Sequence, residues 1–220
     1  MTITRIVIEF KLISAFLSVC RKWFNKMEDK TIPSKQQFIS ISSLKQMGFS
    51  YYKINQMARK GIISKINNKF FENNNYVGEQ SDFYYAYAYV PNGVICLSSA
   101  ASYYNLVSSR LDKIDVAIRR KDKSPALPIW PEIKLHYYSD KRFENGLLTI
   151  NEGENDFKIY DVEKTVVDLV SFKEKIGIEE VKEVLTNYLK RKDRNLNRLI
   201  RYAKLLNCEK TLSTYLEVLL

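Results

Sequence analysis

The segment Phe38–Phe71 constrains the fold of this chain more than any other part of it. It places Ile41, Leu44 and Met47 at intervals of three residues, so one face of a short helix is apolar. Gly48 follows at once, where the C-terminus of a helix needs a residue in the left-handed conformation. We therefore expect a short helix that ends in a tight glycine turn.

A second helix is predicted directly after this turn, over Tyr51–Lys60. Ser50 precedes it, and a serine hydroxyl at this position can accept a free backbone N–H of the first turn. Ile54 and Met57 fall on the side that we expect to be buried. Gly61 is expected to end the helix.

A two-stranded ribbon is predicted after the second helix. Ile62–Ile66 is rich in β-branched residues and favours a strand, and Phe70–Phe71 returns as its partner. Asn67 and Asn68 between them favour a turn. Two helices joined by a tight turn and followed by such a ribbon are typical of a winged helix-turn-helix that binds duplex DNA. The competing interpretation is a plain pair of helices with a solvated polar face.

The polar side chains of this segment suit contacts with DNA. Asn and Gln can pair with adenine, Arg can pair with guanine, and Lys can contact phosphate. Cations beside the ribbon turn can reach the backbone or the minor groove. The predicted DNA-contacting residues are Lys45, Ser50, Tyr51, Tyr52, Lys53, Asn55, Gln56, Arg59, Lys60, Lys65, Asn67, Asn68 and Lys69.

The distribution of charge supports the DNA-binding interpretation. Residues 31–76 contain one acid, Glu72, against seven basic residues, namely Lys35, Lys45, Lys53, Arg59, Lys60, Lys65 and Lys69. The whole chain has a net charge of +10, so this segment supplies more than half of the surplus. Such a surplus favours a polyanionic partner, whereas a merely solvated face usually mixes both signs.

Length and composition indicate a globular, cytoplasmic protein. The 220 residues can form one large or two small domains, and the chain is 45% hydrophobic with only 7 Gly and 5 Pro. The three cysteines, Cys20, Cys96 and Cys208, are far apart and form no CxxC pair. We expect a reducing compartment rather than a disulfide framework.

Residues 1–30 are expected to precede the folded domains. Ile6–Cys20 is largely apolar, but Glu9 and Lys11 interrupt it, and it is shorter than the ~20 apolar residues that span a bilayer. The segment also lacks the pattern of a signal peptide. Two interpretations stay open, an amphipathic helix packed on the domain or a non-native extension. We favour the extension, with Met27 as the natural start.

The remaining pattern predicts an α+β chain with a winged helix-turn-helix over residues 31–78 and a second domain over residues 79–220. A polar linker is expected over residues 72–82, followed by a helix over Phe83–Val90 that Ser81 caps and whose tyrosines fill a core. Val94–Leu97 is a brief apolar run, and a small sheet is expected from strands over Ile114–Arg120, Ile133–Tyr138, Leu147–Ile150 and Phe157–Tyr160. Further helices are expected over Ala100–Tyr104, with Ser98 or Ser99 as the cap, and then over Val162–Phe172, Ile178–Leu189, Leu196–Leu206 and Thr211–Leu220.

No catalytic or metal-binding motif is present in the sequence, so we expect no enzymatic activity, no cofactor and no metal. The one histidine, His136, could act as a base only with a nucleophile such as Ser98 or Ser99. It would also need an orienting carboxylate such as Asp115 or Asp140. Because the spacing does not require this arrangement, we prefer a structural role for His136.

Two further features of the C-terminal part carry polar chemistry. Asp168 lies on an otherwise apolar helix face and needs a partner, such as a backbone N–H, a hydroxyl or an arginine. Arg194, Arg198 and Arg201 are spaced to share one face of a helix. This stripe is either a solvated face or a candidate antitoxin surface. The side opposite the stripe is expected to be buried and holds Leu196, Leu199, Ile200 and Ala203.

Three segments, in their order and spacing, resemble the AbiEi family of antitoxins from type IV toxin–antitoxin systems. The first is Ile41–Phe71, with its glycine turn and basic second helix. The second is PNGVICLSSAASYYNL over Pro91–Leu106, and the third is YDVEKTVVDL over Tyr160–Leu169. The chain departs from the family at Tyr103 and Tyr104, where relatives often carry a histidine.

This resemblance implies an N-terminal winged helix-turn-helix and a C-terminal antitoxin domain. It implies repression of the protein's own operon through inverted repeats in promoter DNA. It also implies that the chain counteracts AbiEii, a nucleotidyltransferase-like toxin of an abortive-infection system for phage defence, without a stable complex. The alternatives are a winged-helix regulator without antitoxin activity and a DNA-positioning subunit of an enzyme.

Overall fold

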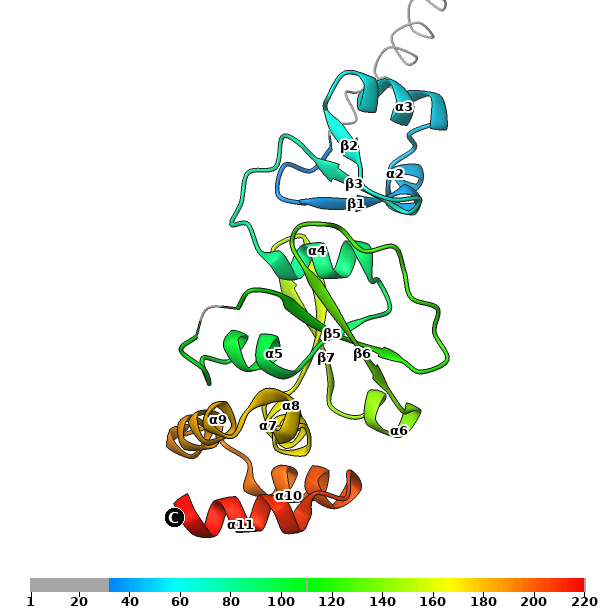
Figure 1. Ribbon diagram of the computed structural model, residues 1–220. Coiled ribbons are helices and arrows are strands. Elements are labelled where there is room, and N and C mark those ends of the chain that lie inside the picture. Colours follow the sequence, from blue (N-terminus) through cyan, green and yellow to red (C-terminus); the bar gives the residue numbers. More distant parts are fainter. Residues whose placement is uncertain (1–31, 110, 220) are drawn as a thin grey trace, which may run out of the picture.

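The computed structural model describes residues 32–109 and 111–219, and it has a mixed α+β fold with two sheets. Figure 1 shows three levels: a small sheet with two helices at the top, a five-stranded sheet in the middle and a group of helices at the bottom. The predicted α+β class is confirmed. The predictions for residues 1–30, including Met27 as a start, lie outside the described residues.

The top level, called here the N-terminal unit, comprises residues 32–76. It contains β1 (Phe38–Ser40), α2 (Ile41–Gln46), α3 (Tyr51–Arg59), β2 (Ile63–Lys65) and β3 (Phe70–Asn73). The three strands form an antiparallel sheet in the order β1-β3-β2. The sequence does not predict β1, because three residues carry no alternating pattern and the strand is defined only by its pairing with β3.

Local chemistry explains where the helices of the N-terminal unit begin and end. The hydroxyls of Ser40 and Ser50 each accept a backbone N–H from the first turn of α2 and α3. Gly48 and Gly61 follow the two helices with φ angles of 82° and 69°. The positive φ of Gly48 confirms the predicted glycine turn, since residues with a Cβ are strained in this left-handed region.

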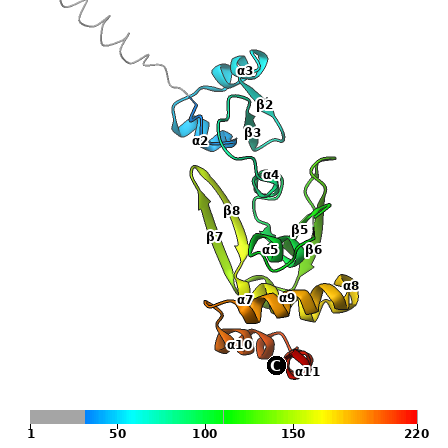
Figure 2. The same ribbon diagram turned by 90° about the vertical axis from the view of Figure 1, so that its left-hand side faces the viewer.

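The middle level is a five-stranded sheet in the order β6-β5-β4-β8-β7. Its strands are β4 (Val94–Ile95), β5 (Ile114–Arg119), β6 (Ile133–Tyr138), β7 (Leu147–Glu152) and β8 (Asn155–Tyr160). β5 runs parallel to β6 and β4 runs parallel to β8, whereas β4 and β5, and β7 and β8, are antiparallel. The central strand β4 is short, and Figure 2 shows β5–β6 and β7–β8 diverging, with helix α4 between them.

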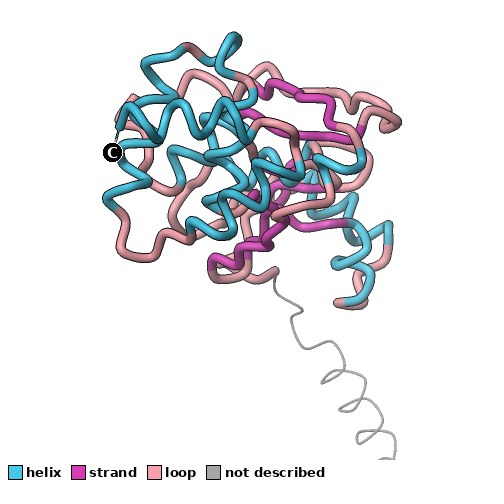
Figure 3. Tube along the Cα trace, turned by 90° about the horizontal axis from the view of Figure 1, so that it is seen from below, coloured by secondary structure: helices cyan, strands magenta, loops and turns pink. Residues whose placement is uncertain are grey.

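Helices pack on both faces of this sheet, and those at the C-terminal end of the chain form the bottom level. They are α4 (Asp82–Tyr89), α5 (Leu97–Tyr103), α6 (Asp140–Phe143), α7 (Val162–Ser171), α8 (Lys173–Ile176), α9 (Ile178–Lys190), α10 (Leu196–Leu205) and α11 (Glu209–Leu219). Seen from below, in Figure 3, the C-terminal helices lie together in front of the strands. Within the described part of the chain, no helix is long and apolar enough to cross a bilayer.

The two faces of the sheet belong to different cores. On β5, Val116 and Ile118 pack in the core that contains α4 together with Phe38 and Phe70 of the N-terminal unit. Ala117, on the other face, packs in the core formed by α5, α7, α9 and α10. This alternation fits a strand whose successive side chains point to opposite faces. The sheet is therefore the layer that connects the N-terminal unit to the C-terminal helices.

Two sequence predictions for this region are wrong in detail. Helix α5 begins at Leu97, and the Ser99 hydroxyl accepts the backbone N–H of Asp115 at 2.8 Å instead of capping the helix. The expected linker over residues 72–82 begins too early, since Glu72 and Asn73 belong to β3. Both errors have the same cause. Local sequence favours a cap at Ser99 and a linker at Glu72 and Asn73, whereas these residues bond to partners on other strands.

Candidate nucleic-acid interface

Helix α3 presents its polar face to solvent. Ile54 and Met57 are only 1% and 5% exposed, because they pack in the core of the N-terminal unit. On the other side Tyr51 is 58% exposed and Tyr52 is 78% exposed. The residues Lys53, Asn55, Arg59 and Lys60 are also exposed, whereas Gln56 is half-buried. Helix α3 is therefore amphipathic, with its apolar side packed in the core and its polar side exposed to solvent.

Lys45 and Tyr51 link the exposed sides of the two helices. The Lys45 ammonium lies 4.0 Å from the centre of the Tyr51 ring. This cation–π contact holds a charge of α2 beside the first turn of α3. Ser50, a predicted DNA contact, uses its hydroxyl oxygen to cap α3, where it accepts the Lys53 backbone N–H at 3.3 Å.

Among the described residues, no acid forms an ion pair with the cations of this unit. All seven basic residues of residues 32–76 are exposed, and none forms an ion pair within the described part of the chain. The one acid, Glu72, accepts a hydrogen bond from the Tyr85 hydroxyl of α4 at 2.9 Å. Glu72 therefore lies at the contact with α4, and the surface around α3 keeps its positive charge.

The ribbon turn exposes some, but not all, of the residues that the sequence predicts as DNA contacts. Lys65, Asn68 and Lys69 are exposed, as a DNA contact requires. Asn67 is half-buried, and its amide nitrogen donates to the Ala88 carbonyl of α4 at 2.8 Å. Its side-chain oxygen accepts the backbone N–H groups of the next turn residues at 2.8 and 2.9 Å. Asn67 is therefore a structural residue of the turn, and it does not belong to the exposed surface.

The N-terminal unit is docked on α4 by aromatic pairs. Phe38 meets Tyr85 with ring centres 4.7 Å apart, and Phe70 meets Tyr87 at 5.6 Å, both edge to face. Burial, reinforced by the hydrogen bond to Glu72, raises the pKa of Tyr85 to about 12. The expected helix over Phe83–Val90 and the packing of its tyrosines into a core are confirmed.

A second seam joins the N-terminal unit to the β7–β8 hairpin. The Asn155 side-chain oxygen accepts the backbone N–H of Gln37 at 2.8 Å, and its amide nitrogen donates to the Lys35 carbonyl at 3.0 Å. Asn155 is buried, so these bonds are shielded from water. The sequence gives no signal for this contact, because its partners are about 120 residues apart along the chain.

The candidate antitoxin surface differs from its prediction. Helix α10 starts at Leu196 with Asn195 as its N-cap, so Arg194 precedes the helix and does not share its face. Arg198 lies 3.6 Å from the Glu163 carboxylate, and Arg201 is exposed. Leu199 and Ala203 are buried as expected. Leu196 and Ile200, predicted to be buried, are each 41% exposed, because the buried side of α10 is centred on Leu199, Tyr202 and Ala203.

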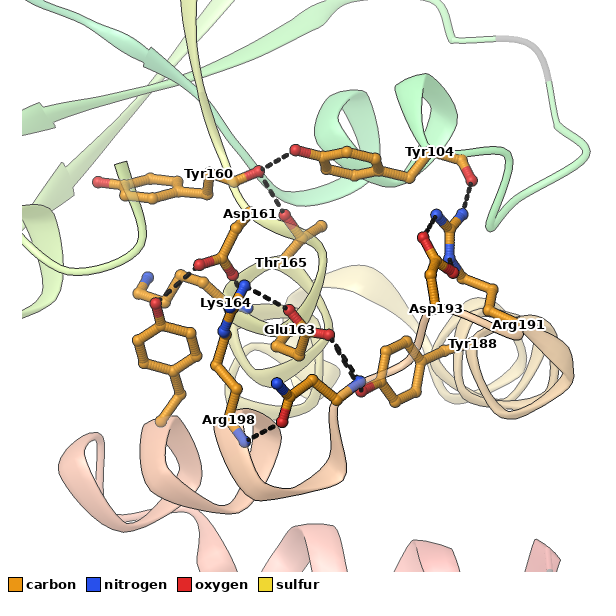
Figure 4. Close-up of polar contacts among 12 residues, drawn as sticks. Tyr104, Tyr160, Asp161, Glu163, Lys164, Thr165, Tyr188, Arg191, Asp193 and Arg198 are labelled. Carbon is orange, nitrogen blue, oxygen red and sulfur yellow. Dashed lines mark hydrogen bonds and ion pairs between the residues drawn. The ribbon is translucent and has the colours of Figure 1, made fainter. Parts of the chain in front are cut away.

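The segment Tyr160–Leu169 contains the start of helix α7 and takes part in a polar network, drawn in Figure 4. The Tyr104 hydroxyl donates to the Tyr160 carbonyl at 2.8 Å. Asp161 caps α7 and also accepts the Tyr202 hydroxyl at 2.7 Å. These bonds connect α5 and α10 to the end of β8.

Glu163 extends this network. One of its carboxylate oxygens accepts the Asn195 backbone N–H at 3.0 Å and the Tyr188 hydroxyl at 3.4 Å. Glu163 is only 4% exposed, and Arg198 is its ionic partner. The network thus fixes the entry to α10 and serves the packing of the C-terminal helices.

Asp168 has the partner that the sequence requires. Arg142 of α6 and Lys164 of α7 both contact its carboxylate, and both Lys164 and Asp168 are fully buried. Burial lowers the pKa of Lys164, and the attraction of Asp168 opposes this shift. The sequence predicts an arginine among the possible partners of Asp168, as Arg142 is. It does not predict Lys164, because nothing in the sequence indicates that this lysine is buried.

His136 also pairs with a carboxylate. Its Nε2 atom lies 2.7 Å from Asp115 Oδ1 on the neighbouring strand. Ser99, one of the nucleophiles considered, bonds to the backbone of β5 through its hydroxyl. Among the described residues, no group of three or more His, Cys, Asp or Glu side chains is placed to hold a metal ion.

No protein-family model and no curated protein matches the chain. The function must therefore be inferred from the residues themselves.

Proposed function

We propose that this chain is a duplex-DNA-binding repressor whose N-terminal unit is a winged helix-turn-helix. In this proposal α3 enters the major groove, α2 supports it, and the β2–β3 turn is a short wing. The order of the elements and the exposed polar face of α3 support this assignment.

The observation that carries the proposal is the set of cations on the N-terminal unit that have no ionic partner among the described residues. The scarcity of acids distinguishes this surface, because residues 32–76 contain Glu72 as their one acid, whereas the C-terminal helices mix both signs, as in the pair of Lys182 and Glu179 in α9 at 3.1 Å. Seven cations that no described acid neutralises suit a partner that supplies the negative charge itself. A duplex presents one phosphate for about every 1.7 Å of its axis, and neutralising it releases counterions.

The C-terminal part is proposed to supply antitoxin activity against a nucleotidyltransferase-like toxin. The support for this second role is the resemblance of Pro91–Leu106 and Tyr160–Leu169 to AbiEi antitoxins. The second of these segments forms the polar network of α7, so it organises the domain and is not itself the contact surface.

The DNA-binding proposal is tested with a charge-depleted variant, defined as Lys53→Ala, Arg59→Ala, Lys60→Ala and Lys65→Ala together. We expect it to bind the protein's own promoter fragment far more weakly, and to lower the salt slope by roughly 0.9 for each phosphate that it no longer neutralises. The matched control removes four exposed cations elsewhere, Lys123, Lys175, Lys190 and Lys210. Equal affinity and equal salt slope for the two variants would refute the proposed surface.

A further inference from the structure

We infer that the exposed side of α3 is divided into a central stripe that reads bases and two flanks that hold phosphates. The stripe is Tyr52, Asn55 and Arg59. The target is duplex DNA whose half-site contains an adenine and a guanine about one or two base pairs apart. This inference rests on the proposed DNA-binding function and assigns a separate task to each part of the helix.

The geometry of α3 sets the division. Ile54 and Met57 are buried and define the inward side of the helix. At 3.6 residues per turn, Tyr52, Asn55 and Arg59 lie together on the opposite side. None of these three has an ion pair within the described residues, and Tyr52 is 78% exposed. The stripe is therefore the part of the unit that reaches furthest into a groove.

The chemistry of the stripe fits base edges. The Asn55 amide can bond both N6 and N7 of adenine, and the Arg59 guanidinium can bond both O6 and N7 of guanine. The two residues are four positions apart, which is about 6 Å along the helix axis. A helix in the major groove is inclined to the duplex axis, and residues three or four positions apart can contact successive base pairs, so this separation corresponds to about one or two steps of the duplex.

The flanks have the chemistry of phosphate contacts. Lys53 and Lys60 lie on one side of the stripe and are exposed. On the other side Tyr51 is stacked against Lys45 at 4.0 Å, so that flank also carries a fixed positive charge. A lysine is a point charge without the planar fork of arginine, and it holds a phosphate without distinguishing bases.

The experiment uses the full chain and measures its preference across a randomised duplex library that contains the promoter half-site. Arg59→Ala should lose about 10- to 100-fold of discrimination at one guanine, and Asn55→Ala a similar amount at an adenine about one or two base pairs away. Arg59→Lys keeps the charge but not the fork, so it should lose the guanine preference while the salt slope stays unchanged. Lys53→Ala and Lys60→Ala should weaken binding evenly and lower the slope by roughly 0.9 each.

The outcomes separate this inference from the function on which it rests. If Arg59→Lys or Asn55→Ala lowers the affinity for all sequences equally and retains every base preference, the division of the helix is overturned, but the DNA-binding function is not. A shift of base preference caused by Lys53→Ala would overturn it as well. Absence of selective binding by the unaltered chain overturns the proposed function together with the inference. Thermal unfolding of each variant is the control for an intact fold, and the melting temperatures should match that of the unaltered chain.

Discussion

Two single residues, one in the N-terminal unit and one among the C-terminal helices, are expected to contribute strongly to the stability of the fold. Gly48 separates the supporting helix from the proposed recognition helix and has a φ of 82°. At the other end of the molecule, Asp168 is fully buried between two cations. Gly48 is required for its backbone conformation and Asp168 for its charge. Substitutions at the two positions should therefore lower the free energy of unfolding by different amounts.

Gly48→Val should lower the free energy of unfolding by about 1–2 kcal/mol, because a β-branched residue is strained in the left-handed region. Thermal or denaturant unfolding of the purified chain measures the loss. Gly48→Asn is the control, since asparagine tolerates this conformation better and should lose less. Valine and asparagine variants with the same melting temperature as the original would show that the turn does not depend on the glycine.

Asp168→Ala should be far more costly, by about 3–5 kcal/mol, because it leaves Lys164 and Arg142 without their shared counter-charge in the core. The matched control is Glu179→Ala, which breaks the exposed pair with Lys182 and should cost less than about 1 kcal/mol. Chemical denaturation of both variants compares them directly. A small loss for Asp168→Ala, similar to that of the control, would contradict the importance of the buried cluster.

Elements are more predictable from the sequence than the contacts between them. Helix α3, strand β6 and helix α9 follow from spacing alone, since Ile54 and Met57 mark a buried helix side and Ile133–Tyr138 favours a strand. Strand β1 is not predictable, because its three residues are ordered only by pairing with β3. In the candidate site, the exposed face of α3 follows from its periodicity. The inward turn of Asn67 does not, since its partner in α4 lies 21 residues away.

The seam between β3 and α4 should weaken in alkaline solution. The pKa of Tyr85 is raised to about 12 in the folded chain, against an ordinary value near 10. Its neutral form therefore stabilises the fold below pH 10, and this contribution is lost as the pH rises from about 10 to about 12. Tyr85→Phe, which cannot ionise, should show a shallower fall of unfolding free energy over this range. Parallel pH profiles for the two proteins would show that Tyr85 does not titrate at the seam.

On the scale of the whole molecule, the N-terminal unit and the five-stranded sheet are joined closely. Phe38 and Phe70 share a core with α4, and Asn155 reaches from the β7–β8 hairpin to the backbone before β1. Cutting the chain at Ser81 would expose Tyr85 and Tyr87, which pack against these phenylalanines. Point substitutions on the far side of α3 therefore separate the two proposed roles more cleanly than truncation does.

The charge-depleted variant should lose repression of its promoter yet still protect cells from the toxin encoded by the neighbouring gene. The reason is spatial: the substituted side chains are exposed on the N-terminal unit and make no ion pair with the described C-terminal helices. A promoter-reporter assay measures repression, growth during toxin co-expression measures protection, and immunoblotting confirms equal abundance. The four-cation control variant should retain both activities. Loss of protection by the charge-depleted variant at normal abundance would mean that the N-terminal unit takes part in neutralising the toxin, and that the two roles share one surface.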